Sequence, residues 1–155
     1  MKYLTIILSL FIASCVSPSA NNNEDSTSAY DSLRAANVGA DNYGMKTYVM
    51  AFLKRGSNPS IDSIEAIRLQ SAHLANIGRL AEEGKLVLAG PFYGKDSLRG
   101  IYIFDTKSID SAKAWTNSDP AIQQGSLEME LKLWYGSAAL MEVNEIHKSI
   151  TKEEF

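Results

Sequence analysis

Between residues 46 and 134 the hydrophobic pattern switches between the two-residue period of a strand and the 3.6-residue period of a helix. The order of these switches restricts the fold more than any other feature of the chain. Strands are predicted over 46–56, 85–92, 98–105 and 126–134, and helices over 61–83 and 108–118. This β-α-β-β-α-β order predicts an α+β fold, the ferredoxin-like sandwich, in which both helices cover one face of the sheet.

The predicted core follows one side of each element. In the first helix, apolar residues recur at spacings of three and four and predict one buried stripe. The members of this stripe are Ile64, Ile67, Leu74, Ile77 and Ala81. Asp62 or Ser60 is a suitable N-cap for this helix, and Gly84 is a suitable end. In the last strand, Leu127, Met129, Leu131 and Leu133 alternate with charged residues and are expected to face the core.

The first strand is apolar on both of its faces. Tyr48, Met50 and Phe52 point one way, and Val49, Ala51 and Leu53 point the other way. Because two helices cover only one face of the sheet, we expect a second copy of the chain to cover the other, in a homodimer whose sheets pack face to face. In the third strand, Gly100 predicts a close approach by backbone or ligand.

The N-terminal region is typical of an export signal. Lys2 precedes an apolar run over 3–14 that is too short to span a bilayer. The run ends at Cys15, the only cysteine in the chain, and 12–15 resembles a bacterial lipobox. This resemblance implies removal of 1–14 and acylation of Cys15, which would anchor the chain in the bacterial cell envelope, at the outer membrane or the periplasmic face. The alternatives are an ordinary signal peptide whose cysteine is discarded and an uncleaved anchor.

The remaining segments divide the chain further. Residues 15–43 are rich in Ser, Asn, Asp and Ala and predict a flexible tether, with at most a transient helix in AYDSLRAAN. Residues 44–136 form the predicted domain, and 137–155 form a tail with a weak helical pattern. The net charge is −3, and Lys and Arg are scattered among acids, which argues against nucleic acid as a partner.

Four stretches of the chain resemble the YCII-related family in their order and spacing. They are HLANIGRLAEEGKLVLAGPF, RGIYIF, SDPAIQQG and LEMELKLWYG, and the resemblance covers 46–135. It implies a dimeric α+β barrel with a His–Asp pair at a pocket, here His73 and Asp119. A few members look like lyases or dehalogenases that act on small cyclic compounds. The chain departs from the family at Gln70, where an arginine often stands one turn before the histidine. Arg68 lies two residues further back, so recognition of an anionic substrate is in doubt.

Physical arguments leave both residues with two readings. On a helical wheel His73 lies at the border of the predicted buried stripe, where it either acts chemically or merely makes a hydrogen bond. Asp119 precedes Pro120, and this pair is typical of a helix start in which Asp is the N-cap. Capping occupies one carboxylate oxygen and leaves the other free, so Asp119 is expected to cap a turn and also face His73. The first helix is about 33 Å long and the second about 16 Å, which allows contact.

Two functions fit these residues. In the first, the protein is a small-molecule lyase or isomerase in which Asp119 orients His73 as general acid/base, acting on a small cyclic or aromatic ligand. In the second, it is a non-catalytic module that binds a small ligand or an envelope protein. Tyr93, Arg99, Trp134 and Tyr135 are candidate pocket-lining residues, although aromatic residues at strand ends are more often core or dimer contacts. With only two histidines and no ligand cluster, no metal or cofactor is expected.

Overall fold

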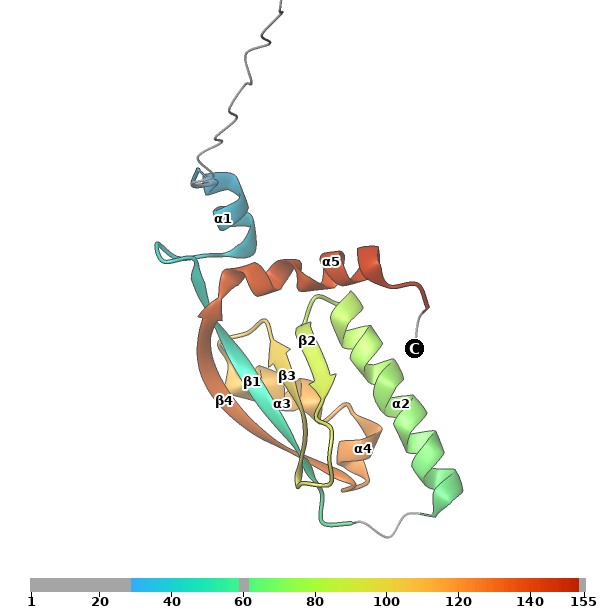
Figure 1. Ribbon diagram of the computed structural model, residues 1–155. Helices are drawn as coiled ribbons and strands as arrows, with labels where there is room; N and C mark the ends of the chain where they lie inside the picture. Colours follow the sequence, from blue (N-terminus) through green and yellow to red (C-terminus); the bar gives the residue numbers. More distant parts are fainter. Residues whose placement is uncertain (1–28, 59–61, 154–155) are drawn as a thin grey trace, which may run out of the picture. The chain divides into compact units, whose positions relative to one another are not determined.

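The computed structural model describes residues 29–58 and 62–153 of the protein (Figure 1). Its helices are α1 (Ser32–Val38), α2 (Ser63–Glu82), α3 (Ile109–Thr116), α4 (Pro120–Gln123) and α5 (Val143–Ile150), and the 3-10 helix η1 covers Ala138–Glu142. Its strands are β1 (Met45–Arg55), β2 (Leu86–Pro91), β3 (Leu98–Phe104) and β4 (Leu127–Ser137). The strands form an antiparallel sheet in the order β2-β3-β1-β4, and the fold is a ferredoxin-like α+β sandwich.

The main core lies between the sheet and α2 and α3, which cover the same face (Figure 1). Strand pairing places Val49 opposite both Phe104 and Leu133, and Ala51 opposite both Tyr102 and Leu131. Side chains that lie opposite one another share a face of the sheet. The fully buried part of this face is Val49, Ala51, Tyr102 and Phe104, against Leu80 of α2 and Ala112 of α3. Leu133 is 58% exposed, so its predicted place in the core is wrong.

Helix α2 buries a different face from the predicted one. Its buried residues are Leu69, His73, Asn76 and Leu80, whereas Ile64 and Ile67 are 82% and 69% exposed. The buried stripe is turned by about a third of a turn from the predicted stripe. The hydrophobic pattern was misleading because α2 buries two polar side chains, and each of these has a hydrogen-bonding partner just after α3. His73 therefore lies within the buried face and not at its border.

The opposite face of the sheet is partly covered by the chain itself. Tyr48, Val87 and Ile103 form a second buried cluster, against which Leu140 and Met141 of η1 pack. Helix α5 crosses the end of the sheet, and Asn144 Nδ2 donates to the Leu86 carbonyl oxygen at 2.9 Å (Figure 1). The predicted tail is thus a covering element. The homodimer remains a prediction for the rest of this face, where Phe52 and Ile101 are half-buried.

Part of the predicted tether is ordered in the structure. Helix α1 lies within it, capped by Asp31 at its start and by Gly39 at its end. Arg34 forms an ion pair with Glu142 of η1. The predicted signal segment and Cys15 lie outside the described residues. Among the helices in 29–58 and 62–153, none is both long and apolar enough to span a bilayer.

Candidate functional site

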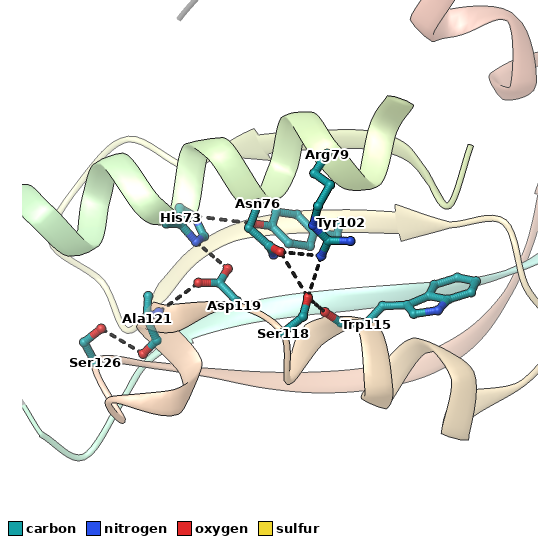
Figure 2. A network of polar contacts seen from close by, with 9 residues as sticks. All are labelled: His73, Asn76, Arg79, Tyr102, Trp115, Ser118, Asp119, Ala121 and Ser126. Atoms are coloured by element: carbon teal, nitrogen blue, oxygen red, sulfur yellow. Dashed lines mark hydrogen bonds and ion pairs between the residues drawn. The ribbon is translucent and has the colours of Figure 1, made fainter. Parts of the chain in front are cut away.

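His73 and Asp119 meet beneath α2. Nδ1 of His73 lies 2.6 Å from Oδ2 of Asp119, as Figure 2 shows. Asp119 is fully buried and His73 is 8% exposed. An ionised carboxylate only accepts hydrogen bonds, so Nδ1 is the ring nitrogen that carries a proton here. In a neutral imidazole the acceptor lone pair is then on Nε2, and this is the nitrogen that can take up a proton.

Asp119 holds this position because its other oxygen caps α4. The Oδ1 atom accepts a hydrogen bond from the Ala121 backbone N–H at 2.9 Å, and Pro120 occupies the first turn. A side-chain oxygen at the N-cap satisfies a backbone donor that has no partner inside the helix. The predicted double use of the carboxylate, with one oxygen on the turn and one on the histidine, is the arrangement found.

Tyr102 of β3 approaches the imidazole from its other side. Its hydroxyl lies 3.3 Å from Nε2, and the two rings stack with centroids 6.2 Å apart (Figure 2). Burial, and secondarily the negative charge of Asp119, raise the pKa of Tyr102 far above its usual value. The hydroxyl therefore keeps its proton and acts as the donor to Nε2. At 3.3 Å this hydrogen bond is long for its type, so another group can replace it.

A second polar network ties α2 to the corner that carries Asp119. The Oδ1 atom of Asn76 accepts from Arg79 Nη2 at 2.8 Å and lies 3.0 Å from the Ser118 hydroxyl (Figure 2). Arg79 Nη2 also lies 2.9 Å from Ser118 Oγ. Asn76 is one turn after His73, and Ser118 directly precedes Asp119. These contacts fix the positions of His73 and Asp119 relative to each other.

A cavity of about 230 Å³ opens beside His73. Its polar lining is His73, Gln70, Arg99 and Ser126, and its apolar lining is Ala66, Leu69, Ala121 and Leu127. The walls come from α2, β3, α4 and the start of β4. His73 is buried but lines this hollow, so its imidazole lies beside any molecule that binds there.

Of the four predicted pocket residues, only Arg99 lines this cavity. Tyr93 lies in the β2–β3 loop and is fully exposed, because the loop extends beyond the sheet. Trp134 packs on Tyr48 on the opposite face, with ring centroids 5.9 Å apart. Successive side chains of β4 point to opposite faces of the sheet, and Trp134 lies an odd number of residues after Leu127. Trp134 therefore faces away from the cavity that Leu127 lines. Tyr135 is half exposed and donates to Asp41. Tyr102 was missed, although the same two-residue period places it with Phe104 on the helix-covered face.

A larger hollow of about 590 Å³ lies between α3, α4 and β4. Its lining includes Lys113, Asn117 and Glu128 but neither His73 nor Asp119. The smaller cavity is therefore the better candidate, because only there do groups suited to proton transfer converge. Within the described part of the chain, no group of three or more His, Cys, Asp or Glu side chains is arranged to hold a metal ion.

Comparison with known proteins identifies the family. The model of the YCII-related domain matches residues 47–135, which is more than half of the chain. The chain belongs to the YCII-related family. This YCII-related chain is 33% identical over 76 residues to protein YciI of Escherichia coli O6:H1 and of Shigella flexneri, covering 43% of the chain and 78% of each relative. It is 31% identical over 64 residues to protein YjpA of Bacillus subtilis, covering 41% of the chain and 73% of that protein.

Among solved structures, a similar one is 5-chloro-2-hydroxyhydroquinone dehydrochlorinase (TftG) from Burkholderia phenoliruptrix AC1100, in complex with 2,5-dihydroxybenzoquinone. The identity is 22% and the TM-score is 0.42, with 56% of this YCII-related chain and 92% of the other chain covered.

Proposed function

We propose that this YCII-related protein catalyses proton transfer on a small cyclic compound, as a lyase or isomerase. The observation that supports it is the 2.6 Å contact between His73 Nδ1 and Asp119 Oδ2 at the wall of a 230 Å³ cavity. The fully buried carboxylate holds the imidazole in the tautomer whose Nε2 accepts a proton. His73 is the general acid/base, and Asp119 and Tyr102 are positioning residues.

The chemistry follows from this assignment. His73 Nε2 takes a proton from a carbon next to a carbonyl, and the electron pair of the C–H bond moves toward the carbonyl oxygen. In an isomerisation, the imidazolium returns the proton to a different atom of the same molecule. In an elimination, the electron pair returns from the oxygen to form a carbon–carbon double bond and expels a leaving group as an anion, and the imidazolium then gives its proton to that group or to water. Asp119 stabilises the imidazolium that forms in both cases.

Proton abstraction can be tested before the substrate is known. The full-length chain is incubated with a panel of cyclic ketones and dienones in D₂O, and deuterium uptake next to the carbonyl is followed by NMR. We expect exchange on at least one member to fall by about 10²–10⁴-fold in His73→Ala. The proposal is refuted if deuterium exchange in His73→Ala proceeds at the wild-type rate. It is also refuted if the wild-type protein accelerates exchange on no compound of the panel.

We further propose that the protein is a lipoprotein of the bacterial envelope and that it acts as a homodimer. Removal of 1–14 and acylation of Cys15 would leave the domain tethered at the outer membrane or the periplasmic face, because two or more acyl chains make attachment stable. The homodimer is supported by Phe52 and Ile101, which lie opposite each other on the half-covered face of the sheet.

A binding module without catalysis is the second candidate, and the outer face of α2 favours it. Ile64 and Ile67 are 82% and 69% exposed there, and Leu74 is 38% exposed. Such apolar residues on one helix face suit a partner protein of the envelope. If this candidate is correct, Ile67→Lys weakens co-purification of an envelope protein with the full-length chain, and His73→Ala does not. Deuterium exchange that depends on His73 would instead favour the enzyme.

A further inference from the structure

Arg99 reaches the cavity because β3 is irregular at this point. The pairing of β1 with β3 shifts register between Leu53, opposite Gly100, and Lys54, opposite Leu98. Arg99 is the extra residue of this bulge, and bulges redirect side chains relative to regular alternation. Its side chain accordingly lines the cavity on the helix-covered face, together with His73.

The surroundings leave the Arg99 guanidinium available to a ligand. Its Nη1 donates to the Gly94 carbonyl oxygen at 3.2 Å. Among the ion pairs of the described residues, none includes Arg99. The described residues that line the cavity include no carboxylate, since Asp119 lies behind His73. Arg99 as a whole residue is half-buried, and its guanidinium is the one permanent charge among the described residues of this lining.

We propose that Arg99 binds the anionic group of the ligand, so that the substrate class is a single-ring compound bearing a carboxylate or an ionised hydroxyl. This inference rests on the proposed function, because it takes the cavity beside His73 as the ligand site. A guanidinium presents paired N–H donors that match a carboxylate. Gln70 of α2 is uncharged, so the positive charge of this lining comes from Arg99 of β3.

The size and lining of the cavity restrict the rest of the ligand. A volume of about 230 Å³ lies below the range of about 300–1,000 Å³ that is usual for drug-sized ligands, and so suits one ring. Leu69 and Leu127 provide apolar contacts for the ring. Gln70 and Ser126 provide hydrogen-bonding groups for its substituents. A ring whose anionic group is held at Arg99 is thereby presented to the imidazole.

Paired acids and amides test this directly. The full-length chain is titrated by calorimetry with benzoate, salicylate and 2,5-dihydroxybenzoate, and with the three corresponding amides. We expect at least one acid to bind about 10- to 100-fold more tightly than its amide. Arg99→Gln should remove this preference, and Arg99→Lys should retain only part of it, because an ammonium lacks the paired donors. The matched control is Arg68→Gln, which removes the same charge from an exposed site on α2 that does not line the cavity.

The outcomes separate this inference from the proposed reaction. Three results overturn the assignment of Arg99: the wild-type protein binds none of the acids, it binds acids and amides equally, or the preference for acids persists in both Arg99 variants. Each of these results counts against Arg99 even if deuterium exchange still depends on His73. If the preference depends on Arg99 but no deuterium exchange occurs, the anion site stands and the catalytic proposal fails. Thermal unfolding of each variant checks that the fold is intact, and Arg99→Lys decides the matter if Arg99→Gln does not fold.

Discussion

His73 and Asp119 lie forty-six positions apart in sequence and 2.6 Å apart in space, and the aspartate serves two elements at once. Its Oδ2 atom contacts the imidazole on α2, and its Oδ1 atom caps α4. A residue with both roles affects folding and chemistry together, so a single truncation cannot distinguish them. Substitutions that retain one role can.

Asp119→Asn should retain the fold and lose the reaction. An asparagine cap is as good as an aspartate cap, but its only oxygen is then used on Ala121, and its NH₂ group faces His73 Nδ1. The imidazole must accept there, so the proton moves to Nε2, which can no longer take one up. We expect deuterium exchange to fall by about 10²–10⁴-fold with a nearly unchanged denaturation midpoint.

Asp119→Ala should in addition lower the free energy of unfolding by about 3–5 kcal/mol. Exchange at the wild-type rate in Asp119→Asn would contradict this role.

Tyr102→Phe should change how stability depends on pH. The pKa of Tyr102 is raised in the folded protein, so the folded state keeps a proton that the unfolded state releases above about pH 10. The stabilisation is fully present below pH 10 and is lost as the pH rises further. We expect the difference in unfolding free energy between wild type and variant to be constant from pH 7 to 9 and to shrink above pH 10. Urea denaturation at each pH measures this, and a difference that stays constant to pH 11.5 would show that the tyrosine is not held in this way.

Gly100→Ala should destabilise the β2–β3 hairpin. A Cβ atom at Gly100 would lie 2.6 Å from the Gly90 carbonyl oxygen and 3.3 Å from Pro91 Cα, so backbone must move. This close approach was predicted from the sequence. We expect a loss of about 1–3 kcal/mol in urea denaturation and weaker binding of acids at the neighbouring Arg99. The control is Gly78→Ala on α2, where a Cβ atom meets nothing within 4 Å and a gain of about 0.5–1 kcal/mol is expected. Equal effects of the two substitutions would refute the steric explanation.

Ile101→Lys should dissociate the proposed homodimer. Ile101 is half-buried on the face of the sheet that faces away from α2, and a charge buried there between two sheets would be unpaired. We expect a dimer for the wild-type protein and a monomer for the variant in sedimentation velocity. Ile67→Lys, on the outer face of α2, introduces the same charge and should leave the dimer intact. A monomeric wild-type protein would remove the basis for a second copy at this face.

Cys15→Ser should release the protein from the membrane. Without the thiol the proposed acylation cannot occur, so the full-length chain should move from the membrane fraction to the soluble fraction and should no longer incorporate a labelled fatty acid. If the uncleaved anchor is correct instead, the wild-type chain incorporates no labelled fatty acid and its mass includes residues 1–14. The two measurements together decide between these readings.

Several errors in the sequence predictions have one cause. Periodicity weights residues by their hydrophobicity, and so it favoured Ile64 and Ile67 as the buried side of α2. The helix instead buries His73 and Asn76, whose polar groups bond to Asp119 and Ser118. Burying a polar group is costly without such a partner, and the partners of His73 Nδ1 and Asn76 Oδ1 come from a distant segment. The pattern of one helix contains no information about them.

The sequence by itself determined the order of the strands and helices, the capping role of Asp119 and the close approach at Gly100, because each depends on local periodicity or local backbone chemistry. Only the tertiary structure decided which side of α2 is buried, that Leu140 and Met141 cover part of the second sheet face, and that Arg99 rather than Tyr93 or Trp134 shares a cavity with His73. These outcomes depend on contacts between residues far apart in the chain. A bulge in β3 sets the place of Arg99, and the hydrogen-bonding partners of His73 and Asn76 set the buried side of α2. Neither is encoded in the hydrophobic pattern.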